Sequence, residues 1–185
     1  MWCDNCLLIF PLRAGGMAWA TIILLYSSIG GIFLFHYGPF LFFVYPEWQV
    51  YGGIALAVAV TAALNTLALA NRSYVWSRAC VVLWPFLIVI SAIRDIIMIV
   101  ELQRGKENIE WECANGGQLW TTSAAAGYGS GNVPSVFCTA GFSSLNTAFI
   151  VCLLADLVFQ TYMLFITWRY ATRLDRYSSL KIEEA

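Results

Sequence analysis

The chain alternates between long apolar runs and short polar segments. Four runs of 19 to 24 residues carry few or no charges, and they cover residues 16–35, 52–70, 79–100 and 145–168. At about 1.5 Å of rise per residue, each is long enough to cross the ~30 Å hydrocarbon layer of a bilayer as a helix. None shows the alternation of barrel strands, and in lipid a helix satisfies its own backbone polar groups. The pattern predicts an all-α, integral membrane four-helix bundle.

The composition agrees with a chain that lies mostly in the membrane. Of the 185 residues, 60% are hydrophobic and only 11% are charged, whereas soluble domains carry about 25% charged residues. We therefore expect residues 1–185 to form a single transmembrane domain, with no separate soluble catalytic unit. Residues 102–144 form one large loop between the third and fourth runs, and residues 169–185 form a C-terminal tail.

Basic residues outside the four runs are distributed unequally. Seven lie before the first run, between the second and third, or after the fourth, and two lie in the remaining loops. The positive-inside rule therefore places both termini in the cytosol and the 102–144 loop in the lumen or outside the cell. The one glycosylation sequon, at Asn71, would then face the cytosol and stay unmodified.

The cysteines divide by the compartment expected for each. Cys113 and Cys138 are the two in the large loop, where the environment is oxidising, and a disulfide between them would contribute ~3 kcal/mol in the chain-entropy model. The alternative is two unpaired thiols. Cys80 and Cys152 lie within predicted helices, as packing residues would.

Cys3 and Cys6 form an isolated C-x-x-C pair before the first helix. Zinc normally takes four ligands, and His36, the one histidine of the chain, is expected on the opposite side of the membrane. The sequence therefore predicts no metal site. Reversible acylation of these juxtamembrane cysteines and inert thiols both fit the pattern.

Polar residues inside the predicted helices carry the strongest functional signal. A charged side chain at the bilayer centre costs ~2.5–3.5 kcal/mol even on the insertion scale, so such residues are rare and usually paired. Arg94 lies ~24 Å from the cytosolic end of its run and Asp156 ~18 Å from that of the antiparallel fourth run, which predicts an Arg94–Asp156 ion pair. Asp95 is expected to point about 100° away, toward a partner or protonated.

Two amides lie at a similar expected depth, Asn65 in the second run and Gln160 in the fourth, and they could bond to each other. With Arg94, Asp95 and Asp156 they make up an intramembrane polar cluster. The cluster could be the site of a proton- or solute-linked transporter. The interpretation that we favour is a buried clamp that fixes helix packing or docks a partner subunit, since four helices are few for an alternating-access carrier.

The tail contains a tyrosine followed at the fourth position by a bulky apolar residue, Tyr177 and Leu180. Peptides of this kind bind clathrin adaptors as extended strands with two side chains in pockets. The pattern fits a sorting signal, with an ordinary amphipathic tail as the alternative.

Catalytic and phosphate-binding motifs are absent from the sequence. It contains no HExxH, GxSxG or P-loop pattern and no His/Cys constellation on one side of the membrane. We expect a non-enzymatic protein without cofactors and without a nucleic-acid partner. Membrane lipids and another membrane protein, or a second copy of the chain, are the expected partners.

The motifs together resemble a known family. Cys3 and Cys6, followed by Pro11-Leu12-Arg13 and a glycine, resemble the start of the lysosome-associated protein transmembrane (LAPTM) family. Arg94-Asp95 in the third run looks like that family's arginine and aspartate, and Phe159, Tyr162 and Trp168 resemble the end of its fourth helix. The entry to the first helix is also similar to the small regulatory subunit of fungal inositol phosphorylceramide synthase.

The resemblance implies a tetraspanning protein of endomembranes (Golgi, endosome, or vacuole and lysosome) rather than of the plasma membrane. Such a protein would assist trafficking, or act as an accessory subunit linked to sphingolipid. LAPTM members typically carry proline–tyrosine motifs that recruit ubiquitin ligases, and this tail has no proline. Tyr177 is then the one sorting candidate in the tail.

Overall fold

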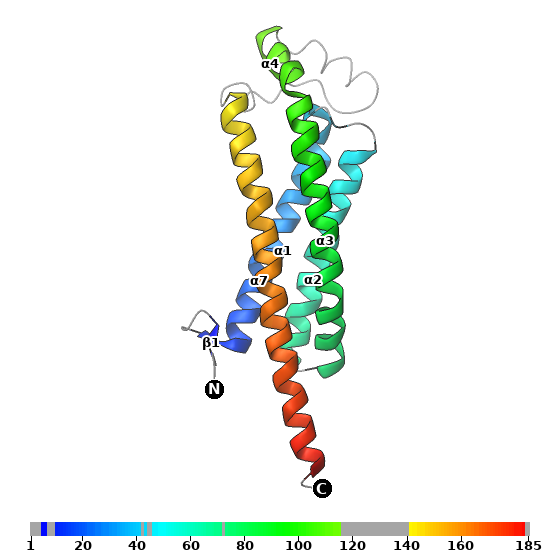
Figure 1. Ribbon diagram of the computed structural model, residues 1–185, viewed down its shortest axis with the longest axis vertical. Coiled ribbons are helices and arrows are strands. Elements are labelled where there is room, and N and C mark those ends of the chain that lie inside the picture. The colour runs from blue at the N-terminus through cyan, green and yellow to red at the C-terminus, as the bar shows by residue number, and fades with distance from the viewer. Residues whose placement is uncertain are drawn as a thin grey trace.

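Four long helices form the body of the protein in this computed structural model (Figure 1). The structure describes the backbone of residues 5–6, 10–41, 43, 46–71, 73–115 and 141–183, and their side chains except at 5–6, 10–11, 39–40, 112, 115 and 176–183. Within these ranges the fold is helical apart from one short antiparallel pair of strands, β1 (Asn5–Cys6) and β2 (Phe10–Pro11).

The expected four membrane-spanning helices are confirmed. They are α1 (Leu12–Tyr37), α2 (Glu47–Ala70), α3 (Tyr74–Arg104) and α7 (Phe142–Glu183), and each is long and apolar enough to cross a bilayer. Every helix is longer than the apolar run that predicts it. Hydropathy marks the part of a helix that suits lipid, whereas backbone hydrogen bonding continues into the polar interface at both ends.

Two short helical segments connect the spans. A single 3-10 turn, η1 (Gly38–Leu41), follows α1. A charged helix, α4 (Lys106–Asn115), follows α3 directly after Gly105 and opens the loop expected at 102–144. Ile109 is buried there, in an apolar cluster with Leu102 and Met98 of α3. The α4 helix therefore lies across the end of the bundle (Figure 1).

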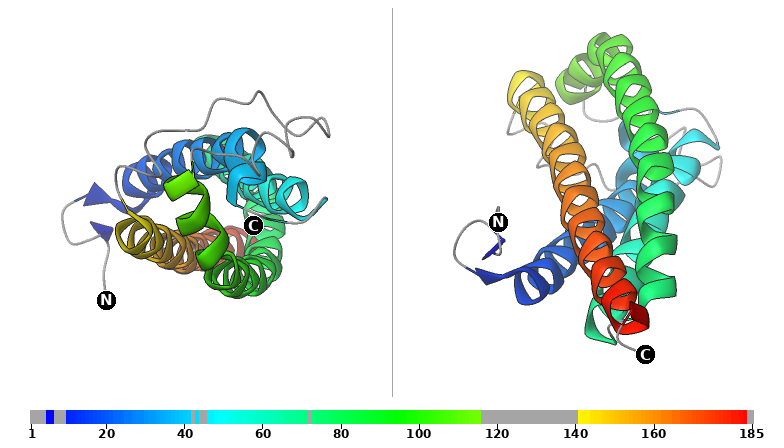
Figure 2. Two further views of the ribbon diagram at one scale, coloured as in Figure 1. Left: turned by 90° about the horizontal axis from the view of Figure 1, so that it is seen from above. Right: turned by 60° about the horizontal axis from the view of Figure 1, so that its bottom comes forward.

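The four spans form a ring in which each helix packs against its two neighbours, in the order α1, α2, α3, α7 and back to α1. Seen from above, the ring is closed at the end near the viewer by α4 (Figure 2). The strands β1 and β2 and the C-terminal part of α7 lie at the opposite end of the bundle from α4 (Figure 1). The first and the last described elements of the chain therefore lie at the same end of the bundle.

The closest helix pair, α1 with α2, depends on glycine. A Cβ added at Gly31 would lie 3.1 Å from the side chain of Leu56 and 3.3 Å from the backbone oxygen of Gly52. Small residues let two helix backbones approach closely in lipid, where apolar area alone does not drive association. The alanines of α2 follow the same rule, since Ala55, Ala59 and Ala62 are buried.

A second contact ties α1 to the far end of α2. The guanidinium of Arg13 donates from Nε to the carbonyl oxygen of Leu69 at 2.9 Å and from Nη2 to that of Ala70. The last carbonyls of a helix lack partners within the helix and carry partial negative charge, so that a cation is stabilising there. Arg13, noted in the sequence as part of a Pro-Leu-Arg motif, therefore caps the C-terminus of α2.

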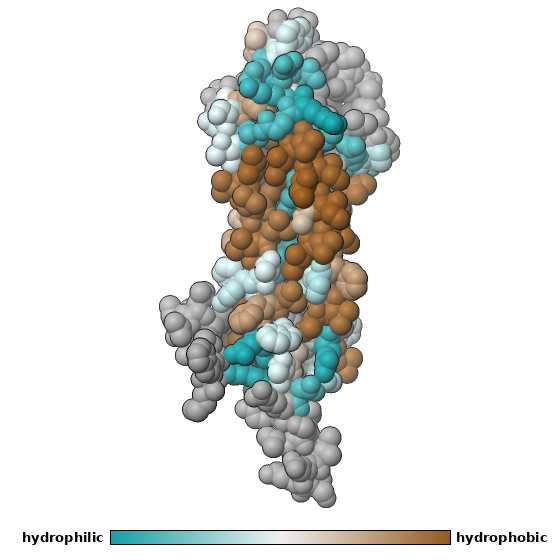
Figure 3. Space-filling view, viewed as in Figure 1, coloured by the Kyte–Doolittle hydropathy of each residue, from teal (hydrophilic) through white to brown (hydrophobic). Residues whose placement is uncertain are grey.

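The outer surface of the bundle has the layers expected of a membrane protein. Apolar side chains cover the middle of the face in Figure 3, and polar residues gather toward α4 and toward the opposite end. Many large apolar side chains of the spans are exposed, among them Ile29 of α1, Phe86 and Ile96 of α3 and Val158 of α7. Such a surface suits lipid contact rather than water.

We predict that a side chain at Gly31 destabilises the bundle and that one at Gly30 does not. Both glycines lie in α1, so Gly31→Val and Gly30→Val change helix propensity equally, but position 30 has no atom within 4 Å of an added Cβ. Overpacking at position 31 should cost about 1–3 kcal/mol more. The measurement is denaturation of each purified variant in mild detergent. Equal losses would show that the α1–α2 contact is not glycine-dependent.

Candidate functional site

The charged cluster, defined here as Arg94, Asp95, Asp156 and Gln160, lies inside the bundle between α3 and α7. All four side chains are buried, and Arg94 is only 4% exposed. Arg94 is ten residues from the end of α3, about 15 Å along the helix axis, and Arg104 at that end is exposed. The cluster therefore lies within the apolar part of α3 and α7, away from the polar end of the bundle.

Arg94 binds two carboxylates at once. Its Nη2 donates to Oδ2 of Asp156 on α7 at 2.9 Å, and Nε and Nη2 donate to Oδ1 of Asp95 at 3.0 and 2.9 Å. The pair expected between Arg94 and Asp156 is present. The expectation that Asp95 points away from it is wrong. A rotation of 100° separates the two Cβ atoms, but the long arginine side chain turns back far enough to reach its neighbour.

Gln160 completes the cluster from one turn further along α7. Its Nε2 donates to Oδ2 of Asp156 at 2.9 Å, so this oxygen accepts from both Gln160 and Arg94. The bond considered between Gln160 and Asn65 is therefore not formed. Asn65 instead donates from Nδ2 to Oγ1 of Thr167 at 2.9 Å and joins α2 to α7.

The depth estimate for Asn65 failed because α7 does not end where its apolar run ends. Thr167 lies seven residues beyond Gln160, which is about 10 Å along the helix axis. Helix ends read from hydropathy do not include the extension of α7 to Glu183, nor the tilt of one helix against another. Errors in the predicted helix ends therefore shift the predicted partner of Asn65 by about two turns of α7, from Thr167 to Gln160.

The charges of the cluster do not balance. One guanidinium faces two carboxylates, so the formal charge is −1 when both acids are ionised. Three buried oxygens of the cluster also lack a hydrogen-bond partner among the described residues: Asp95 Oδ2, Asp156 Oδ1 and Gln160 Oε1. Each of these atoms can only accept a hydrogen bond. The cluster therefore has capacity for a proton or another donor.

Aromatic side chains of α1, which the sequence analysis did not single out, hold this helix against α7. Tyr26 donates to the carbonyl oxygen of Cys152 at 2.8 Å, and the indole of Trp19 donates to that of Phe159 at 3.2 Å. Trp19 also meets the rings of Phe159 and Tyr162 edge to face. The signal in the sequence is a stripe at seven-residue spacing along one face of α1: Trp19, Tyr26 and Phe33.

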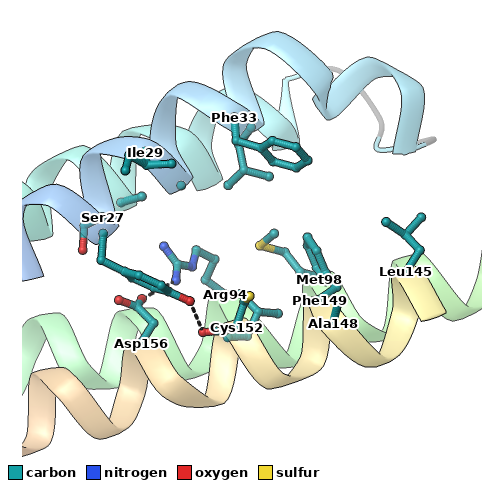
Figure 4. A pocket seen from close by; sticks show the side chains of 15 residues that line it. Ser27, Ile29, Phe33, Arg94, Met98, Leu145, Ala148, Phe149, Cys152 and Asp156 are labelled. Atoms are coloured by element: carbon teal, nitrogen blue, oxygen red, sulfur yellow. Dashed lines mark hydrogen bonds and ion pairs between the residues drawn. The ribbon is translucent and has the colours of Figure 1, made fainter. Parts of the chain in front are cut away.

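Tyr26 joins α1 to α7, and the two helices diverge toward the end of the bundle that carries α4 (Figures 1 and 2). A cavity of about 350 Å³ lies in this space, walled mainly by α1, α3 and α7. Figure 4 shows Ser27, Arg94 and Asp156 at one end and Phe33, Met98 and Leu145 toward the other. The cavity is apolar along its length and polar at the end formed by the charged cluster.

In comparisons with known proteins, no family model, no curated protein and no solved structure matches the chain. The site must therefore be interpreted from its own residues.

The remaining predicted site residues are separate from the cluster. Cys113 of α4 is disulfide-bonded, whereas Cys80 and Cys152 are free. Cys138, Cys3 and the side chain of Cys6 lie outside the described residues. The side chains of Tyr177 and Leu180 do too, but their backbone belongs to α7 and is helical. In the described part of the chain, no three metal-binding side chains gather.

We predict that the three charges act as one unit in folding. Asp156→Ala should lower the free energy of unfolding by about 1–3 kcal/mol, because Arg94 keeps Asp95 as its counter-ion but loses its hydrogen bond to α7, and the amide of Gln160 loses its acceptor. Arg94→Leu with Asp156→Leu should recover little, since Asp95 then stays charged and unpaired. The triple variant with Asp95→Leu added should recover most of the loss. Denaturation in detergent measures each value.

The matched control for this series is Asp175→Ala. Asp175 of α7 also pairs with an arginine of α3, Arg78, at 3.0 Å, but both side chains are about half exposed. Such a pair contributes about 0–1 kcal/mol. A triple variant no more stable than Asp156→Ala, or a loss in Asp175→Ala as large as that in Asp156→Ala, would contradict the prediction.

Proposed function

We propose that this protein is a non-enzymatic tetraspan membrane protein that serves as a trafficking adaptor or as an accessory subunit of another membrane protein. The observation that supports this is that its buried charges are bound to one another. Arg94 is bound to Asp95 and Asp156 on two helices, and such a clamp fixes helix register. The apolar outer face offers surface for lipid and for a partner's helices.

The orientation that we propose follows the charge distribution. Arg13 and Arg78 lie at one end of the bundle, while α4 at the other end carries Glu107, Glu110 and Glu112. By the positive-inside rule the first end is cytosolic. The large loop after α4 is then lumenal or extracellular, and Cys113 pairs there with Cys138 in an oxidising compartment.

An endomembrane location rests on the resemblance to the LAPTM family and to the small subunit of inositol phosphorylceramide synthase. Both are tetraspanning accessory proteins, and both link the proposal to sphingolipid metabolism or transport. In this reading the partner is a lipid enzyme or a cargo protein, and the four helices of this chain pack beside it in the membrane.

The tail supplies a sorting signal in this proposal. Tyr177 and Leu180 are three residues apart and thus about one turn apart on α7, whose helix reaches Glu183. Clathrin adaptors take such peptides as extended strands. Recognition would therefore require the last turns of α7 to unwind, and the unwinding of a terminal turn costs little free energy.

The proposed orientation predicts an oxidised Cys113–Cys138 pair and an unglycosylated Asn71. Mass spectrometry of protein alkylated before reduction should find one peptide pair joined through these two cysteines. The same digest should contain the Asn71 peptide without glycan. Glycan on Asn71, or alkylation of both cysteines without reduction, would place the large loop on the cytosolic side and contradict the proposal.

The accessory role predicts a stable complex. Protein extracted from its native membrane in mild detergent should migrate with one other membrane protein, or with a second copy, at a constant ratio. The triple neutral variant at positions 94, 95 and 156 should keep that ratio, because the clamp is structural. Native mass measurement gives the stoichiometry.

A small transporter is the second candidate, favoured by the −1 charge of the cluster and by the cavity beside it. In that case the protein would run alone as a monomer in the same experiment. Reconstituted in liposomes, it would carry protons or a solute down an imposed pH gradient, and Asp156→Asn would abolish the flux. These two results together would contradict the accessory role and support a transporter function.

A further inference from the structure

The cavity between α1 and α7 has a chemical asymmetry that neither the clamp nor the accessory role uses. One end presents Asp156 Oδ1 and, beside this carboxylate, Ser27 Oγ; neither atom has a hydrogen-bond partner within 3.5 Å among the described residues. Ser27 is 3% exposed and Asp156 6%. A buried carboxylate oxygen and a hydroxyl without partners are costly in an apolar surrounding. A ligand that donates hydrogen bonds would remove that cost.

The walls of the cavity fit a hydrocarbon chain. Phe33, Met98, Phe149 and Leu145 line it beyond the polar end (Figure 4). From Asp156 to Leu145 the cavity follows α7 for eleven residues, or about 16 Å. The volume of about 350 Å³ lies near the lower end of the range for small-molecule pockets, ~300–1,000 Å³. Length and volume together suit one chain rather than two.

The rim of the cavity faces the bilayer. Ile29 on α1 is 68% exposed, and Cys152 on α7 is exposed opposite it. Both lie within membrane spans, where the surrounding medium is lipid. The two helices are joined at Tyr26 and diverge toward the end of the bundle that carries α4 (Figures 1 and 2). A molecule dissolved in the membrane can therefore enter sideways between α1 and α7 without crossing water.

The charge of the cluster determines which head group an amphiphile bound in the cavity can carry. Arg94 is already bound to Asp95 and Asp156, so the cluster carries a formal charge of −1 when both acids are ionised. An anionic head group would be repelled, and a neutral hydroxyl would leave the charge uncompensated in a medium of low dielectric. A protonated amine both donates hydrogen bonds to Asp156 Oδ1 and Ser27 Oγ and neutralises the cluster.

We propose that this cavity binds a single-chain amphiphile from the surrounding bilayer, with its protonated amine at Asp156 and Ser27 and its chain between α1 and α7. This proposal rests on the residues of the cavity alone. It would therefore hold whether or not the complex predicted above is found.

The test uses the full-length protein in nanodiscs of neutral lipid and a photoreactive long-chain alkylamine. Labelling should map to the cavity-facing segments of α1 and α7, residues 26–34 and 145–156. Excess dodecylamine should compete, whereas dodecanol and dodecanoate, with the same chain, should compete about tenfold less well or worse, since hydrogen bonds between charged groups contribute that much.

Matched glycine variants separate the cavity from general lipid partitioning. Position 30 lines the cavity and has no atom within 4 Å of an added Cβ, and position 53 on α2 is equally open but lies outside the cavity. Gly30→Leu should abolish the competed labelling and Gly53→Leu should retain it. Both variants must first show the denaturation midpoint of the parent protein, and Ala148→Leu replaces Gly30→Leu if that variant does not.

Two further variants test the head-group contact. Asp156→Asn should weaken competition by dodecylamine about tenfold or more, while Ser27→Ala should weaken it less, because a hydroxyl contributes a weaker bond than a carboxylate. Equal competition by the three dodecyl compounds would reduce the site to an unselective apolar crevice and overturn the proposal. So would labelling that Gly30→Leu leaves unchanged, or no competed labelling at all.

Discussion

The requirement that no charge be left alone in lipid determines how α3 and α7 pack in this protein. Arg94 is buried within the membrane-spanning part of the bundle, and it is bound to one carboxylate on its own helix and one on α7. A salt bridge of this kind is directional. The 2.9 Å contact with Asp156 therefore fixes the rotation and the register of α7 against α3, which apolar packing alone would leave open.

Helix α1 packs against α2 and α7 through two different kinds of interaction, and this difference creates the cavity. Against α2, glycine and alanine let the backbones approach, and Arg13 closes the far end on the carbonyls of Leu69 and Ala70. Against α7, large aromatic rings at Trp19 and Tyr26 hold the helices near their crossing. A helix pinned to one neighbour along its length and to the other at one crossing must diverge from the second, and the space between them is open to lipid.

The four spans and one buried ion pair were predictable from the sequence because each follows from a local quantity. Hydropathy gives the spans, and the distance of Arg94 and Asp156 from their helix ends gives the pairing. The partner of Asn65 was not predictable, since it depends on helix tilt and on where α7 ends. The contact between Asp95 and Arg94 was not predicted because the directions of the two Cβ atoms do not account for the reach of a long arginine side chain. Helix α4 was not predicted because a charged ten-residue helix contains no apolar run.

The cavity could not be predicted from the sequence for a related reason: it depends on how three helices are arranged around it, and no single segment encodes that arrangement. The charge at one end of the cavity, however, could be predicted in part from the sequence. A chain with two aspartates and one arginine inside its membrane spans has one negative charge in excess when both acids are ionised, and desolvation makes that charge costly to keep. A clamp would be complete with one aspartate. The second carboxylate gives the cluster an acceptor for a donor that this chain does not itself provide, and Asp156, placed at the cavity wall with one oxygen unpaired, is where such a donor can reach it.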